Sequence, residues 1–188
     1  MESLFKEIEK MLVKKPDAII GIDGFCASGK TTVASMIAEK FDVQIIHMDD
    51  FFLPQEMRTE ERLSQTGGNV HYERFNAEVV SGLEKGCEFA YRAYSCKIGD
   101  YAKEIRVLPG KAIIIEGSYS LHPAIDLCFD LKIFVKADYE TRLQRILKRN
   151  GTQALEMFKS KWIPLENRYF EEFDIESKCD IIIQTEKQ

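Results

Sequence analysis

A glycine-rich segment at residues 24–32 carries the clearest chemical pattern in this 188-residue sequence. Its glycines let backbone N–H groups turn inward toward phosphate oxygens. Lys30 can reach the β- and γ-phosphates of a nucleotide, and the hydroxyl of Thr31 can bind Mg²⁺. The segment matches G-x-x-x-x-G-K-[ST] followed by Thr32, and its residues are Gly24, Phe25, Cys26, Ala27, Ser28, Gly29, Lys30 and Thr31. The pattern predicts a site for a nucleoside triphosphate.

The flanking residues supply the structural context that this motif needs. Residues 18–22 form a short apolar run that predicts a buried strand. After the motif, apolar residues recur at helical spacing from Val33 to Phe41. A strand, a glycine loop and a helix in this order distinguish a phosphate-binding loop from an ordinary glycine-rich turn.

Two acidic sites follow predicted strands. Residues 43–47 predict a strand that leads into Asp49 and Asp50, and the apolar run 111–116 ends in Glu116. Ligands of open α/β sheets bind beyond the carboxyl ends of the strands, so both sites are expected near the phosphates. Asp49 could take a proton from an attacking hydroxyl or hold Mg²⁺ through water, and Glu116 could reach the metal in a Walker B arrangement.

Plainer interpretations exist for these strand-end residues. The two aspartates could cap the next segment, and Glu116 could face solvent. His47 is expected to pack at the strand end rather than to act as a base.

A stripe of arginines is expected on a later helix. Residues 138–149 predict a helix on which Arg142, Arg145 and Arg149 recur at i, i+3 and i+7. Guanidinium groups near a triphosphate would stabilise charge on the transferring group. A solvated charged face is the alternative interpretation.

The middle of the chain predicts an insert at about residues 54–108. Residues 54–70 are polar and long for a connection, which favours an acceptor-binding flap or a disordered surface loop. Residues 73–83 predict a helix, and residues 89–96 and 104–108 predict a hairpin that turns at Gly99.

The remaining elements complete a single domain. Residues 2–15 predict a helix, 131–135 and 180–184 predict strands, and 152–173 are helical with a break at Pro164. We expect the P-loop NTPase fold, a doubly wound parallel α/β sheet with helices on both faces and a small β-hairpin insert. Residues 1–188 form one P-loop domain in this interpretation, with a lid at about 138–160.

Composition narrows the partners. The net charge of −5 argues against a general affinity for nucleic acid or anionic membrane. The five scattered cysteines indicate free thiols in a reducing cytoplasm, and no apolar run approaches the roughly 18 residues of a membrane span. The sequence leaves open whether the chain forms a homo-oligomer.

The N-K-x-D and D-x-x-G motifs of GTPases are absent, and the short chain favours a small-molecule kinase. Four segments carry a more specific resemblance: GFCASGKTT at 24–32, HMDDFF at 47–52, IEGSYSL at 115–121 and TRLQRILKR at 141–149. In order and spacing they resemble the uridine kinase family, a group that includes nicotinamide riboside kinase and phosphoribulokinase.

This resemblance implies roles for individual residues. Asp49 corresponds to the general base, Glu116 to the carboxylate near Mg²⁺, and Arg145 and Arg149 to lid arginines. Tyr94 resembles a base-stacking tyrosine. The acceptor half departs from the family, because His71, beside Tyr72, stands where the family has a ribose-binding aspartate, and Ser95 follows Tyr94.

We therefore expect an ATP- and Mg²⁺-dependent kinase that phosphorylates a hydroxyl of a small molecule. The 5'-hydroxyl of a uridine- or cytidine-like nucleoside is the favoured acceptor. The alternatives are a non-nucleoside alcohol or vitamin-like acceptor and a regulator that binds ATP without transferring phosphate. The sequence does not distinguish ATP from GTP as the donor.

Overall fold

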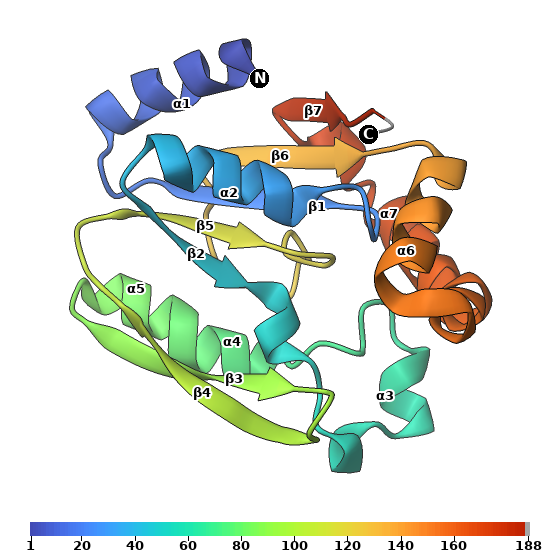
Figure 1. The fold of residues 1–188 in the computed structure, drawn as a ribbon. Helices are drawn as coiled ribbons and strands as arrows, with labels where there is room; N and C mark the ends of the chain where they lie inside the picture. Colours follow the sequence, from blue (N-terminus) through green and yellow to red (C-terminus); the bar gives the residue numbers. More distant parts are fainter. Residues whose placement is uncertain (187–188) are drawn as a thin grey trace.

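The core of the protein is a five-stranded parallel sheet. The computed structural model describes residues 1–186 (Figure 1). The strands lie in the order β2-β5-β1-β6-β7, and every neighbouring pair is parallel. Their bounds are β1 (Ile19–Gly24), β2 (Val43–His47), β5 (Ala112–Glu116), β6 (Leu131–Lys136) and β7 (Ile181–Gln184). The predicted doubly wound α/β sheet is confirmed.

Helices and the insert cover the two faces of this sheet. Helices α1 (Glu2–Lys14) and α2 (Lys30–Lys40) pack on one face through an aliphatic cluster that contains Ile8, Ile20 and Ile37. The other face packs against the insert and α7 (Ile163–Phe173) through a cluster rich in aromatic residues, including Phe51 and Tyr169. Figure 1 shows α2 beside β1 and the insert on the opposite side of the sheet.

The insert contains a separate two-stranded antiparallel sheet, as predicted. Strand β3 (Phe89–Ser95) pairs with β4 (Asp100–Val107) around a turn that contains Gly99, and a β-bulge interrupts the register between Ala93 and Tyr94. Strand β4 begins four residues earlier than the alternation of apolar residues predicted. Pairing with β3 extends it, because Tyr94 lies opposite Tyr101.

The polar segment 54–70 is folded rather than extended. It contains a 3-10 turn (Gln55–Met57) and helix α3 (Glu60–Ser64), and Arg62 donates hydrogen bonds to the carbonyls of Gly68 and Val70. The predicted helix 73–83 is divided into α4 (Tyr72–Phe75), a π-helical turn (Asn76–Val80) and α5 (Ser81–Lys85).

The C-terminal helices bend at Gly151 rather than at Pro164, where the sequence predicted a break. Helix α6 (Tyr139–Met157) contains a kink at Gly151, whose φ of 82° is not helical. Pro164 does not interrupt the helix, because it lies in the first turn of α7, where its missing N–H leaves no hydrogen bond unmade. No helix within residues 1–186 is both long and apolar enough to cross a membrane.

A buried carboxylate joins the end of β1 to two other parts of the fold. Asp23 is fully buried. Its Oδ1 accepts hydrogen bonds from the amides of Gly24 (2.7 Å) and Tyr119 (3.2 Å), and its Oδ2 accepts from the Leu121 amide (3.0 Å) and the Tyr169 hydroxyl (2.7 Å). Burial raises the pKa of Asp23 to about 6, while these hydrogen bonds and Lys30 oppose the rise. The side chain thus fixes the start of the glycine loop, the segment after β5 and α7 together.

We predict that Asp23→Asn lowers the free energy of unfolding by roughly 2–3 kcal/mol, because the new amide N–H₂ would face N–H donors and leave them unsatisfied. Tyr169→Phe, which removes one of the four donors, should cost only about 1 kcal/mol. Urea unfolding of the three proteins measures both effects. Equal stability of Asp23→Asn and the wild type would contradict the structural role.

Candidate phosphate-binding and acceptor site

The glycine loop between β1 and α2 has the backbone shape of a phosphate-binding loop. Gly24 has φ 142° where β1 ends, and Gly29 has φ 104° immediately before α2 begins at Lys30. A Cβ on Gly24 would lie 1.9 Å from the carbonyl oxygen of Val135 in β6, so only glycine fits there. The loop therefore turns back at the N-terminus of α2, where amide groups favour an anion.

Lys30 lies inside this loop with its ammonium group folded back on the backbone. Its Nζ donates to the carbonyl oxygens of Gly24 (2.8 Å) and Phe25 (2.9 Å) and to Ser118 Oγ (3.2 Å), and the residue is 7% exposed. These neutral partners leave the positive charge uncompensated by any carboxylate within 4.0 Å in the described chain. An incoming phosphate would supply the missing negative charge.

Thr31 and Glu116 meet beside the glycine loop. Strands β2 and β5 pair in register, so that His47 lies opposite Glu116. Thr31 Oγ1 donates to Glu116 Oε1 at 3.1 Å, and His47 Nδ1 lies 2.6 Å from the same oxygen. This hydrogen bond raises the pKa of His47. His47 therefore contacts the candidate metal carboxylate instead of only packing at the strand end.

The two aspartates after β2 have different surroundings. Both lie in a 3-10 turn (Met48–Phe51). Asp50 Oδ2 accepts a hydrogen bond from the Tyr91 hydroxyl at 3.1 Å, which ties it to β3. Asp49 has no hydrogen-bond partner for its carboxylate within residues 1–186 and is exposed. Surrounding protein atoms raise the pKa of Asp49, whereas Lys30 lowers it. Asp49 is thus the aspartate available to a ligand.

Two of the three stripe arginines contact the loop backbone. Arg142 donates from Nε to the Cys26 carbonyl at 3.2 Å and lies over the Phe25 ring. Arg145 Nη1 donates to the carbonyls of Ala27 (3.1 Å) and Ser28 (3.2 Å). Arg149 is exposed and donates to its neighbour Asn150.

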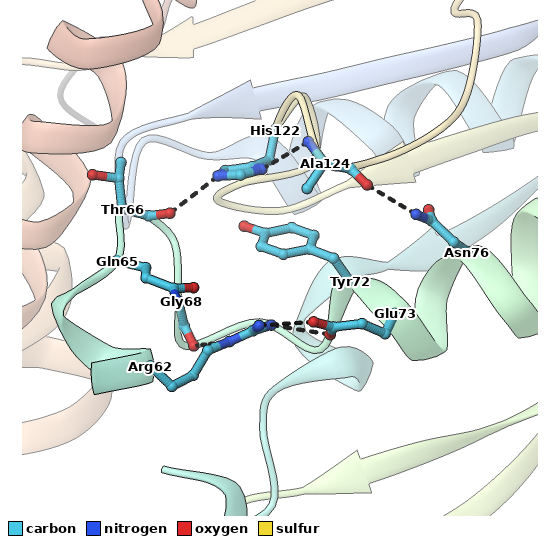
Figure 2. Close-up of a pocket in the computed structure, with 9 residues that line it drawn as sticks. All are labelled: Arg62, Gln65, Thr66, Gly68, Tyr72, Glu73, Asn76, His122 and Ala124. Atoms are coloured by element: carbon cyan, nitrogen blue, oxygen red, sulfur yellow. Dashed lines mark hydrogen bonds and ion pairs between the residues drawn. The ribbon is translucent and has the colours of Figure 1, made fainter. Parts of the chain in front are cut away.

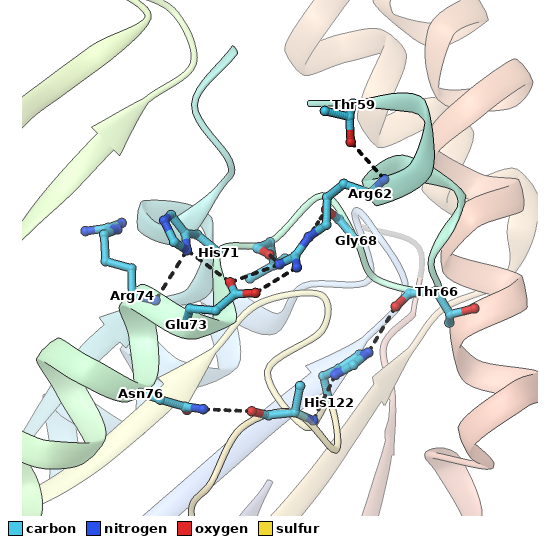
Figure 3. A network of polar contacts seen from close by, with 11 residues as sticks. Thr59, Arg62, Thr66, Gly68, His71, Glu73, Arg74, Asn76 and His122 are labelled. Carbon is cyan, nitrogen blue, oxygen red and sulfur yellow. Dashed lines mark hydrogen bonds and ion pairs between the residues drawn. The ribbon is translucent and has the colours of Figure 1, made fainter. Parts of the chain in front are cut away.

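The predicted acceptor residues do not line one cavity. His71 caps α4 by accepting from the Arg74 amide at 3.3 Å, and its ring lies 3.1 Å from Glu73 (Figure 3). Tyr72 is buried and stacks on His122 with ring centroids 4.3 Å apart (Figure 2). Tyr72 lines a cavity of about 200 Å³ that neither His71 nor Tyr94 lines. Tyr94 is buried with its ring edge against Tyr101.

Residues 54–70, which we call the flap, are held beside this cavity by ion pairs and hydrogen bonds. Arg62 pairs with Glu73 at 2.7 Å, and His122 Nε2 contacts the Thr66 carbonyl at 3.1 Å (Figure 3). The Arg62 hydrogen bond lowers the pKa of Glu73 to about 2. Burial lowers the pKa of His122, so a neutral ring that donates from Nε2 fits these contacts.

Sequence reasoning missed three residues at the loop: Asp23, Ser118 and Glu166. Asp23 had a usable signal, because a charged residue at the end of an apolar strand run needs a partner when the strand is buried. No pattern in the sequence around Ser118 or Glu166 indicates a contact with the loop. Their partners lie 88 and 140 residues away in the sequence.

The parallel sheet and the glycine loop before α2 together define a P-loop protein. The family model described as "Phosphoribulokinase / Uridine kinase family" matches residues 19–154, and this chain belongs to that family. A uridine kinase from Latilactobacillus sakei is 32% identical over 146 residues, which cover 73% of this chain and 68% of that protein. Uridine kinase-like protein 5 of Arabidopsis thaliana is 33% identical over 150 residues, or 74% of this chain. The chain spans only about a third of the length of that plant protein.

Solved structures support the fold. A structure described as a possible uridine kinase from Bacillus stearothermophilus aligns with a TM-score of 0.68 at 18% identity, covering 97% of this chain and 100% of that chain. D-glycerate 3-kinase from Cryptococcus neoformans aligns with a TM-score of 0.60 at 10% identity, covering 87% and 86% of the two chains. At 18% and 10% identity, these likenesses show the fold alone.

We predict that Gly24→Ala abolishes nucleotide binding and destabilises the fold, because its Cβ would overlap the Val135 carbonyl oxygen. Gly99→Ala is the matched control: Gly99 also has a positive φ of 71°, yet a Cβ added there would meet nothing within 4 Å. The control should lose only roughly 1 kcal/mol of stability from backbone strain. Calorimetric titration with a nucleotide and thermal unfolding measure the two effects. Normal binding by Gly24→Ala would refute the close fit.

Proposed function

We propose that this chain transfers the γ-phosphate of ATP to the 5'-hydroxyl of a uridine- or cytidine-like nucleoside. The observation that carries the proposal is the arrangement of Lys30, Thr31 and Glu116 around the glycine loop, with Asp49 in the turn that directly follows β2, the strand that pairs with β5. In this proposal residues 54–108 bind the acceptor and residues 138–160 form a lid. Kinship with uridine kinases supports the nucleoside.

The donor set fits Mg²⁺. Thr31 Oγ1 and Glu116 Oε1 are oxygen ligands 3.1 Å apart, and Mg²⁺ is typically bound by one or two protein oxygens plus substrate phosphates. Bound there, the ion would neutralise charge on the transferring phosphate. Lys30 would turn from the carbonyls of Gly24 and Phe25 toward the same phosphate.

Asp49 is the proposed general base. An exposed carboxylate with no hydrogen-bond partner among the described residues can accept the proton of an acceptor hydroxyl as that oxygen attacks phosphorus. Arg142 and Arg145 donate hydrogen bonds to backbone carbonyls of the glycine loop. When the lid closes, Arg145 and Arg149 would stabilise negative charge on the transferring phosphate. Closure would also exclude water from the phosphate.

A second candidate acceptor is a small non-nucleoside alcohol that carries an acidic group. Arg58 favours it: Nε is fixed by the Leu53 carbonyl at 2.8 Å, and Nη2 lies 3.5 Å from Cys96 Sγ on the hairpin side. No carboxylate pairs with Arg58 within the described residues, and a guanidinium group in that state suits an anionic ligand. The burial of Tyr94 against Tyr101 also leaves less of its ring for base stacking.

The experiment that tests the proposal is ADP release by the purified chain with Mg²⁺ and each member of an acceptor panel. We expect turnover with uridine or cytidine, and ATP should be compared with GTP as donor. Turnover only with hydroxy acids such as glycerate, or with pantothenate, would replace the nucleoside by the second candidate. Nucleotide binding without turnover on any acceptor would favour a regulator.

We predict that Asp49→Asn lowers kcat at least about 100-fold, because the amide cannot take the acceptor proton, while nucleotide affinity changes little. Asp50→Asn is the matched control, since that carboxylate is directed to the Tyr91 hydroxyl, and it should retain most turnover. Steady-state rates and nucleotide Kd values check both. An Asp49→Asn enzyme with near wild-type kcat would show that Asp49 is not the base.

A further inference from the structure

Glu166 is a buried carboxylate at the glycine loop that the proposed transfer does not use. It lies in the first turn of α7 and is 4% exposed. Its Oε2 accepts a hydrogen bond from the Cys26 amide at 2.8 Å, and its Oε1 accepts from Ser118 Oγ at 2.7 Å. Helix α7 thus places a carboxylate between the loop and the segment after β5.

These contacts extend from Glu166 to the phosphate-binding lysine. Ser118 Oγ, held by Glu166, accepts a hydrogen bond from Lys30 Nζ at 3.2 Å. Cys26 is held from both directions, because Glu166 binds its amide and Arg142 Nε binds its carbonyl at 3.2 Å. Glu166 therefore restrains both the loop backbone and, through Ser118, the ammonium group.

Packing alone does not account for a carboxylate at this position. No lysine or arginine within the described residues pairs with Glu166 within 4.0 Å, and an apolar cluster that includes Ile163 lies nearby. Burying an unpaired charge is costly, and an apolar side chain would pack there at lower cost. The directed contacts to Cys26 and Ser118 are what a carboxylate supplies.

We propose that Glu166 is a positioning residue that holds the glycine loop and, through Ser118, Lys30 in the geometry that receives nucleotide phosphates. The inference rests on the proposed function only in that the loop binds ATP, and it does not depend on the acceptor. Glu166 is assigned no contact with the reacting atoms.

The test is the Kd of a non-hydrolysable ATP analogue with Mg²⁺, measured calorimetrically on the full chain and its variants. Glu166→Ala should weaken binding about tenfold, since a charge-assisted hydrogen bond to the loop is lost. Glu166→Gln should restore most of the affinity, because the amide oxygen can accept from Cys26 and its N–H₂ can donate to Ser118. Ser118→Ala should weaken binding, and less so when Glu166 is already alanine.

Glu172→Gln is the matched control. It alters another α7 carboxylate, one that accepts hydrogen bonds from Thr66 and Arg168, and it should leave the nucleotide Kd unchanged. Tighter binding by both Glu166 variants would mean that the carboxylate repels phosphate, which overturns the inference. A lower Tm of Glu166→Ala with an unchanged Kd would reduce Glu166 to a stabilising residue and also overturn it.

Two further results would contradict the role of Glu166 or the binding of nucleotide. If Glu166→Ala does not fold, an unchanged Kd in Ser118→Ala would still refute the connection to Lys30. A wild-type chain that binds no nucleotide would refute the proposed function itself, and that result differs from any change confined to the variants.

Discussion

The carboxylate of Asp23 is the constraint on which the arrangement of the site depends. Asp23 is the penultimate residue of β1. Its carboxylate accepts hydrogen bonds from the first residue of the glycine loop, from two amides after β5 and from Tyr169 in α7. Tyr119, one of these amide donors, adopts a left-handed φ of 72°, which costs a non-glycine residue free energy. The hydrogen bond to Asp23 helps to hold that conformation. Ser118, the residue before Tyr119, then lies within hydrogen-bond distance of Lys30. The buried carboxylate of Asp23 therefore helps to shape the phosphate-binding site.

Helix α7 connects this constraint to both halves of the site. Tyr169 reaches Asp23, and Glu166 reaches the glycine loop. On the same helix, Arg168 donates to the Ser64 carbonyl at 2.8 Å and Glu172 accepts from Thr66, both in the flap. A single helix therefore contacts the phosphate-binding loop and the segment proposed to bind the acceptor. Because α7 is packed in the aromatic core, these contacts share one rigid support.

The two halves of the site differ in how directly their residues serve chemistry. In the phosphate half, Lys30 lies within the glycine loop that follows β1, and Thr31 contacts Glu116 at the end of the neighbouring strand β5, an arrangement that the parallel sheet imposes. In the acceptor half, the residues that the family resemblance singled out have structural partners: His71 caps α4, Tyr72 stacks on His122, and Tyr94 packs against Tyr101. This contrast is why the transfer reaction is better defined than the acceptor.

The sequence by itself determined the sheet and the glycine loop and predicted that Glu116 lies beside that loop, because these features follow from local apolar periodicity and from the rule that parallel strands end at a common edge. It also located the hairpin insert, whereas the break that it predicted at Pro164 lies instead at Gly151. Only the tertiary structure decided that Asp49 is free while Asp50 is bound to Tyr91, that Arg142 and Arg145 reach the loop, and that Glu166 joins it. Those outcomes depend on contacts between residues far apart in the chain, and the local pattern around each residue carries no record of its distant partner.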